Sequence, residues 1–134
     1  MVINMKALKT DLEAILESFK KKMRIMDEGE EAFLVMPFFR LREDDSMVLK
    51  FFEEDDCLYI SDSGDTVRYL SDRGGNIEDY RESFEKIKKK YFIKERGEYE
   101  LVLEFPSESA SAVHTFVGYF IEGLTLIGNL ALIG

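Results

Sequence analysis

Apolar side chains recur every three or four positions near the start of the chain, a spacing that places them on one face of a helix. This pattern predicts an amphipathic helix from about Lys6 to Met26, followed by a break at Asp27 to Glu31. Cations at positions 20–24 lie in the last turns, where positive charge complements the helix dipole. The apolar positions are Met5, Leu8, Leu12, Ile15, Leu16, Phe19, Met23 and Met26.

Three runs of apolar, β-branched and aromatic residues come next, and acidic turns separate them. The first run covers residues 33–39 and contains Pro37, which cannot donate a ladder hydrogen bond and therefore places the strand at an edge or ends it. Met47 to Phe52 and Cys57 to Ser61 form the second and third runs. Short strands joined by turns predict an antiparallel three-stranded meander.

A polar turn at residues 61–65 follows the third strand, and a short helix should begin near residue 65. Ser63 or Asp65 is a suitable N-cap, because a short polar side chain can accept a hydrogen bond from a free N–H group of the first turn. Gly74, or the glycine after it, is the expected end of this helix.

Two helices and a hairpin complete the pattern. Asn76 can cap a second central helix, whose exposed side is basic over residues 78–90. Residues 92–94 and 99–105 read as two strands of a hairpin, and the last helix runs from a serine within 107–111 to about Leu132. The lysines of the central helix complement its dipole, and docking of an acidic partner or phosphate is the alternative interpretation.

Together these elements predict a single α+β domain over residues 1–134. The expected sheet is antiparallel and consists of the three-stranded meander plus the C-terminal hairpin. An N-terminal helix, two central helices and a long apolar C-terminal helix are expected to pack against it. A chain of 134 residues can bury a sufficient core without disulfides or metals.

The net charge of −9 is concentrated in one part of the chain. Residues 27–65 contain thirteen acidic residues and three basic ones, whereas the rest is close to neutral. An acidic surface of this size argues against direct nucleic-acid contact through it, and it suits a basic protein partner or mimicry of nucleic acid. The structural interpretation is a solvated sheet rim, since charges also deter pairing between sheet edges.

Composition also bears on compartment and assembly. Cys57 is the only cysteine, and the N-terminal stretch is polar and amphipathic, so a reducing, cytoplasmic location is expected. The last helix carries Glu122 near its middle and has no positive flank, so we expect no membrane span. Instead it should lie across the sheet and supply a homodimer surface. The absence of Gln and the many Lys and Glu residues are typical of hyperthermophile proteins.

The turn after Cys57–Ser61 is the candidate binding site. Two interpretations remain open: Asp62 and Asp65 hold a hard cation, Mg²⁺ or Mn²⁺, or Asp65 caps the helix while Asp62 shapes the turn. A further carboxylate for the cation would come from residues 53–56. Arg68 is the nearest cation if the turn binds an anion. The candidate residues are Ser61, Asp62, Gly64, Asp65, Thr66 and Arg68.

The turn and its surroundings also carry a family resemblance. The matching positions are Met36-Pro37-Phe38, Leu58, Ser61-Asp62, Gly64, Thr66, Leu70 and Gly74. This pattern resembles the prokaryotic family catalogued as domain of unknown function eighteen twenty-eight. The chain departs from that pattern at Met36, where Thr is usual, and at Ser63, where a second Asp is usual. The family has no agreed activity, so the resemblance implies a fold and leaves the function open.

A non-enzymatic interaction or regulatory module without a cofactor is the predicted function, because the sequence lacks a convincing set of base, nucleophile and oxyanion donors. The alternative is a metal-dependent phosphoryl-transfer or hydrolytic enzyme that uses the Asp62/Asp65 turn. The two differ in one requirement, since only the enzyme needs a divalent ion to activate water.

Overall fold

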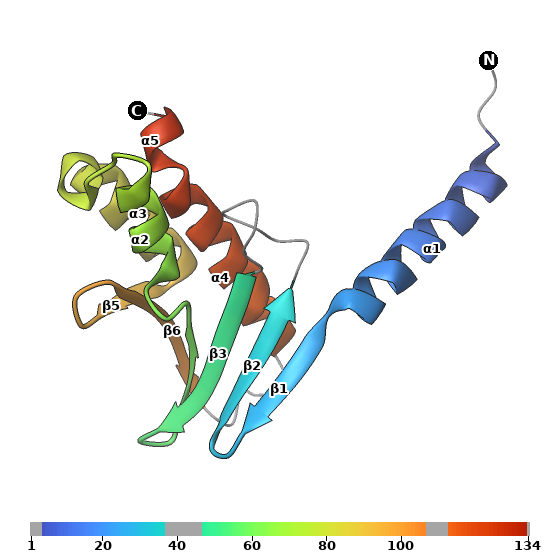
Figure 1. The fold of residues 1–134 in the computed structure, drawn as a ribbon, viewed down its shortest axis with the longest axis horizontal. Coiled ribbons are helices and arrows are strands. Elements are labelled where there is room, and N and C mark those ends of the chain that lie inside the picture. Colours follow the sequence, from blue (N-terminus) through green and yellow to red (C-terminus); the bar gives the residue numbers. More distant parts are fainter. Residues whose placement is uncertain (1–3, 37–46, 107–112, 134) are drawn as a thin grey trace.

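The computed structural model describes residues 4–36, 47–106 and 113–133, and it confirms the α+β class (Figure 1). Its strands are β1 (Arg24–Glu28), β2 (Glu31–Met36), β3 (Met47–Glu54), β4 (Cys57–Ser61), β5 (Ile93–Arg96) and β6 (Glu100–Pro106). Its helices are α1 (Met5–Lys22), α2 (Asp65–Asp72), α3 (Arg81–Tyr91), α4 (Val113–Gly128) and α5 (Leu130–Ile133), with a 3₁₀ turn η1 (Ile77–Tyr80) before α3. The strands form one antiparallel sheet in the order β1-β2-β3-β4-β6-β5.

Strand β1 corrects the prediction that the first helix continues to Met26. The helix ends at Lys22, and the backbone of Arg24–Glu28 pairs with β2, from Arg24 opposite Val35 to Glu28 opposite Glu31. Residues 27–31 are therefore part of a hairpin, in which Gly29 takes a positive φ of 73°. The meander has four strands because β2 offers a hydrogen-bonding edge, which helical periodicity does not reveal.

The central helices begin and end much as expected. The Asn76 side chain accepts a hydrogen bond from the Glu78 N–H, at 3.0 Å, and caps the 3₁₀ turn. Helix α2 ends at Asp72, and Gly74 follows with a φ of 82°. The Gly75 N–H donates to the Leu70 carbonyl and the Gly74 N–H to the Ser71 carbonyl. This Schellman arrangement satisfies carbonyls that the helix end leaves open.

One face of the sheet carries the helical layer. Figure 1 shows α4 crossing this face, with α2 and α3 beside it. Phe120, Leu124 and Ile127 of α4 are buried, and the Phe116 ring stacks on Phe105 of β6 with 4.5 Å between centroids. The expected burial of the C-terminal helix is thus observed. The serines predicted to start this helix and residues 37–39 of the predicted first strand lie outside the described residues. Within the described ranges, no helix combines the length and apolar character that a bilayer crossing requires.

Helix α1 does not pack on the sheet, contrary to the expectation for the N-terminal helix. It projects away from the domain as an extension of β1 (Figure 1). Only Met23 lies between α1 and β1. A connection that reverses the chain between a helix and a strand usually needs about two to six residues. The apolar face of α1 is therefore exposed to between 38% and 60% at Met5, Leu8, Leu12, Ile15 and Leu16.

Candidate functional site

Asp62 is the centre of the strand-to-helix turn predicted as the candidate site. Its carboxylate accepts hydrogen bonds from the N–H groups of Gly64 at 2.8 Å, Thr66 at 3.1 Å and Leu101 at 3.0 Å. The Asp62 N–H in turn donates to the Leu101 carbonyl, at 3.2 Å. The side chain is only 3% exposed. Asp62 therefore ties the start of α2 to β6 from within the protein.

The identity of the capping side chain differs from the prediction. The N-cap position is Gly64, with a φ of 85° and no side chain of its own, so neither Ser63 nor Asp65 fills that role. Asp62 supplies the cap from two residues earlier, because the turn directs its carboxylate back over the free N–H groups. Burial raises the pKa of Asp62, and the N–H hydrogen bonds partly oppose this rise.

The neighbouring candidates divide between interior and surface. Ser61 is fully buried, where its hydroxyl donates to Glu100 and accepts from the Ser63 N–H. Asp65, by contrast, has a side chain 61% exposed, and it pairs with Arg68 at 3.4 Å. The turn thus brings the six predicted residues together but separates the two carboxylates, since Asp62 is buried and Asp65 is at the surface.

Residues 53–56 do not join this turn. They lie at the β3–β4 hairpin, and Asp62 follows the opposite end of β4. A strand of five residues is about 16 Å long, so these acids cannot supply a further ligand to a cation at Asp62. Across the described ranges, no group of three or more His, Cys, Asp or Glu side chains is placed to hold a metal ion.

A shallow pocket of about 390 Å³ opens beside the turn. Arg68, Lys50 and Arg96 contribute its cations, and each has a carboxylate partner. Lys50 lies 3.4 Å from Glu31, and Arg96 lies 2.9 Å from Glu54. An anion would have to displace these acidic partners, so the geometry does little to favour anion binding by Arg68.

Nearby acidic side chains also neutralise part of the positive charge of the basic central helix, α3. Lys88 lies 2.7 Å from Glu95 and 2.9 Å from Glu85. Arg81 contacts Glu78 and the same two carboxylates, and these contacts, Glu78 first, raise the pKa of its guanidinium. These ion pairs join α3 to β5, which is a structural role for two of the basic side chains.

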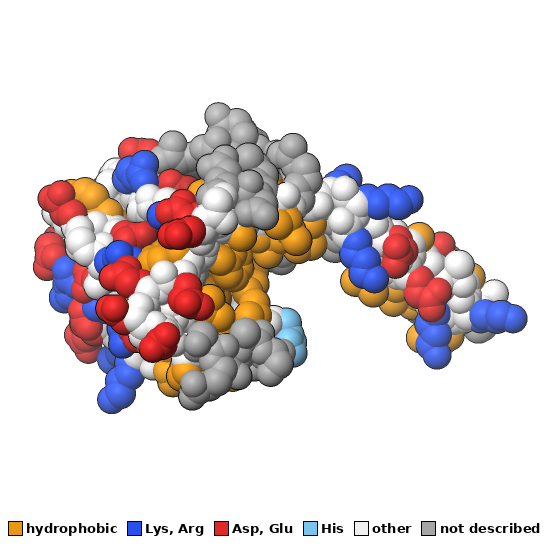
Figure 2. Space-filling view, turned by 90° about the horizontal axis from the view of Figure 1, so that it is seen from below, with side chains coloured by type: hydrophobic (Ala, Val, Ile, Leu, Met, Phe, Trp, Pro, Cys, Tyr) orange, Lys and Arg blue, Asp and Glu red, His pale blue; other side chains and the backbone are white. Residues whose placement is uncertain are grey.

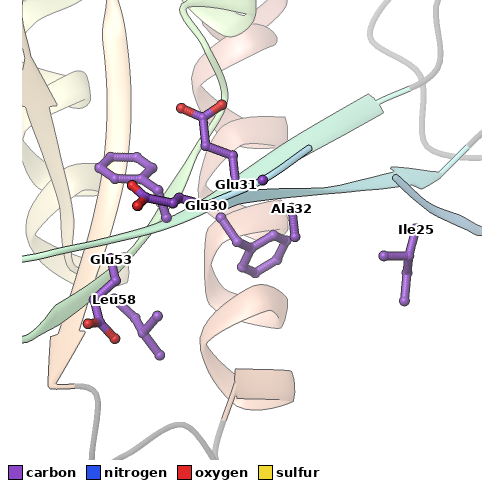
Figure 3. A pocket seen from close by; sticks show the side chains of 9 residues that line it. Ile25, Glu30, Glu31, Ala32, Glu53 and Leu58 are labelled. Carbon is purple, nitrogen blue, oxygen red and sulfur yellow. The ribbon is translucent and has the colours of Figure 1, made fainter. Parts of the chain in front are cut away.

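A second candidate site, not predicted from the sequence, lies at the β1 side of the sheet. This groove has a volume of about 310 Å³ (Figure 3). Strand register places Ile25, Ala32, Phe51 and Leu58 on the sheet face that also carries the buried Leu49. We call it the β1–β4 groove, and its lining residues are Ile25, Gly29, Glu30, Glu31, Ala32, Phe51, Phe52, Glu53 and Leu58.

The groove combines an apolar floor with an acidic rim. Ile25 is 78% exposed, which is unusual for a β-branched aliphatic side chain on a helix-bearing sheet face. Figure 3 shows Glu30 and Glu53 beside the apolar side chains, whereas the Glu31 carboxylate points to the other side of the strands, where it pairs with Lys50. The sequence did contain a signal, because Ile25 and Leu34 fit a paired-strand alternation, but assigning residues 23–26 to a helix concealed it.

The resemblance carried by the Asp62 turn stays a prediction, because it rests on a short pattern of residues. No family model, curated protein or solved structure matches the chain.

Proposed function

We propose that this protein is a non-enzymatic interaction module that binds a basic amphipathic helix of a protein partner in the β1–β4 groove. The observation that carries the proposal is the apolar floor, in which Ile25 is exposed and Ala32, Phe51 and Leu58 are half-buried. Amphipathic helices bind such grooves by inserting side chains spaced three and four residues apart. Exposed apolar surface rimmed by polar groups is typical of a site for another protein.

The acidic rim supports a basic partner. Glu30 and Glu53 border the groove, and they belong to the segment that holds most of the negative charge of the chain. Charges at the rim of an interface mainly accelerate association and exclude partners of the wrong sign. The proposal therefore specifies a helix with lysine or arginine beside its apolar stripe.

The module is proposed to act as a homodimer in the cytoplasm, where its single cysteine stays reduced. The sequence placed the dimer surface on the C-terminal helix. The outward side of α4 is mostly polar, with His114, Thr115, Glu122 and Thr125 exposed beside Tyr119 and Leu126. A larger apolar surface is available elsewhere in the described chain, on α1. A regulatory role and a high-temperature origin stay predictions.

A peptide titration tests the groove. The probes are two labelled synthetic helices of 18 residues, one built from Leu and Lys and the other from Leu and Glu, with the same apolar spacing as α1. Fluorescence anisotropy should show at least about tenfold tighter binding of the basic peptide, because the acidic rim discriminates by charge. Ile25→Asp should weaken that binding about tenfold or more.

Leu132→Asp is the matched control for this substitution. Leu132 is also exposed and aliphatic, at 64%, but it lies on α5 and is not part of the groove. The control should bind the basic peptide as the wild type does. Equal affinity for the two peptides, or equal losses in the two variants, would contradict the proposal.

The metal-dependent enzyme remains the alternative, and it has its own test. An ion at a hundred times its Kd would stabilise the protein by about 2.7 kcal/mol, a rise of several degrees in Tm. We expect Mg²⁺ and Mn²⁺ to leave the Tm unchanged, because the Asp62 carboxylate already accepts three backbone N–H groups. A rise that Asp65→Asn abolishes would favour the enzyme instead.

A further inference from the structure

We infer that the helix bound in the β1–β4 groove is α1 of a second copy, so that two chains exchange their N-terminal helices. This inference rests on the proposed function and names the partner of the same site. Three observations carry it: the exposed apolar face of α1, its one-residue connection to β1, and the opposite charges of α1 and the groove rim.

Helix α1 has the form of a ligand for the groove. It contains 18 residues, and its apolar stripe is exposed at Leu8, Leu12 and Ile15. In proteins, most of the stability of an amphipathic helix comes from packing of its apolar face. Figure 2 shows apolar side chains on α1 and on the body of the domain bordering the same open space. The apolar stripe of α1 and the apolar floor of the groove would each be buried by contact with the other.

The short connection between α1 and β1 prevents α1 from binding in the groove of its own chain. The helix ends at Lys22 and the strand begins at Arg24, with Met23 alone between them. To lie over its own groove, α1 would have to reverse direction within this single residue, and such a reversal usually takes about two to six residues. Figure 1 shows that α1 continues outward from β1 instead. The helix is thus presented to a neighbouring molecule.

The charges of the two surfaces are complementary. Helix α1 contains five lysines and three acidic residues, so it is a basic segment of an acidic protein. Three of these lysines, Lys20 to Lys22, form its last turn. The groove rim is acidic through Glu30 and Glu53. Attraction between the segments would orient the incoming helix, and repulsion between two acidic rims would disfavour other pairings.

Reciprocal exchange gives a closed assembly. Each chain donates one helix and accepts one, which is the self-complementary arrangement of a twofold dimer. A helix of 18 residues is about 27 Å long, so both dockings together can bury two extended apolar stripes. The exchange leaves neither α1 nor a groove exposed, and the dimer cannot grow into a filament.

Light scattering after size-exclusion chromatography tests the assembly. Wild type should be a dimer, and Leu12→Asp should be a monomer because the charge falls within the apolar stripe. Ala14→Asp is the matched control, since two residues along a helix correspond to a rotation of about 200° and place the charge on the opposite side. The control should remain a dimer. A monomeric wild type, or the same mass for both variants, overturns the exchange.

Cysteine cross-linking tests which chain supplies the helix. In a Cys57→Ser background, Leu12→Cys chains are mixed with Ile25→Cys chains and treated with a short bis-maleimide. The exchange predicts a covalent dimer that contains one chain of each kind. A chain that carries both cysteines should also be linked to a second chain. If it is linked within a monomer instead, α1 closes on its own sheet and the exchange is overturned.

The peptide titration, repeated on Leu12→Asp, separates failure of the exchange from failure of the proposed function. With its own helix disabled, this variant should bind the Leu/Lys peptide more tightly than the wild type does. If the variant binds the peptide and the wild type is a monomer, the groove function stands and the exchange is overturned. If neither protein binds the peptide, the proposed function fails, and the exchange fails with it.

Discussion

Asp62 shows how one side chain can look catalytic in sequence and serve the fold in three dimensions. A carboxylate in a Ser-Asp-Ser-Gly-Asp turn fits a cation site as well as a helix cap. In the structure it binds two N–H groups of its own turn and a third from Leu101, far away in sequence. The cap and the joint between β4, α2 and β6 therefore depend on the same buried group.

Replacement of Asp62 should be costly, whereas replacement of Asp65 should not. Asp62→Ala leaves three N–H groups without their acceptor, two of them at the start of α2, and should lower the free energy of unfolding by about 3 kcal/mol or more. Asp65→Ala removes an exposed first-turn acid and should cost less than about 1 kcal/mol. Urea denaturation of both variants measures this difference. Equal losses would show that Asp62 does not carry the turn.

The raised pKa of Asp62 predicts a pH dependence with a definite sign. The folded protein binds the Asp62 proton more tightly than the unfolded chain does, because burial disfavours the charged form. That contribution to stability is complete below the ordinary aspartate pKa of about 4 and is lost as the pH rises through the raised pKa. Relative to Asp62→Asn, which does not titrate, the wild type should become less stable as the pH rises.

Urea denaturation of the wild type and Asp62→Asn across this range measures the effect. The difference between their free energies of unfolding should change with pH in the stated direction and then level off. A constant difference would mean that the hydrogen bonds cancel the effect of burial on the Asp62 pKa.

The helices and strands were predicted best where neighbours in sequence form them. The hairpin of β5 and β6, the Asn76 cap and the turn at Gly74 that ends α2 all depend on hydrogen bonds between residues close in sequence. Strand β1 was missed because its partner β2 decides its conformation. Helix α4 contains two glycines, Gly118 and Gly123, whose surroundings differ. The sequence alone does not distinguish these surroundings.

Alanine at these two glycines should have opposite effects on stability. At Gly118 an added Cβ meets nothing within 4 Å, so Gly118→Ala should raise the free energy of unfolding by about 0.5–1 kcal/mol. At Gly123 the Cβ would meet the Ile93 side chain and lie 3.1 Å from the Tyr91 Cβ. Gly123→Ala should therefore lower the free energy of unfolding by about 1–3 kcal/mol. Thermal unfolding of both variants measures these effects. A Gly123→Ala variant more stable than the wild type would show that α4 can move away from α3 and β5.

A single chain leaves apolar surface unburied on helix α1 and in the β1–β4 groove. The body of the domain buries its core with α2, α3 and α4, while α1 and the β1–β4 groove keep apolar surface open. Such surface rarely stays uncovered in a monomer. The exchange of α1 between copies would cover both surfaces, and it links the stability of the protein to its concentration.

The Tm of the wild type should consequently rise with protein concentration, because association stabilises the folded state by mass action. Leu12→Asp should have a lower Tm that does not depend on concentration. Differential scanning calorimetry over a hundredfold concentration range measures both, with Ala14→Asp as the control that retains the dependence. A wild-type Tm that stays constant over this range would be inconsistent with a dimer that dissociates on unfolding.

The sequence by itself determined the α+β class, the amphipathic character of α1, the Asp62 turn and the C-terminal hairpin. These features follow from periodicity and from hydrogen bonds between near neighbours, which are encoded within short segments. Tertiary structure decided the conformation of β1, the burial of Asp62 against Leu101, the distance from Asp62 to residues 53–56, and the groove beside Ile25. Each of these requires two segments distant in sequence to meet, and no local pattern specifies which segments will do so.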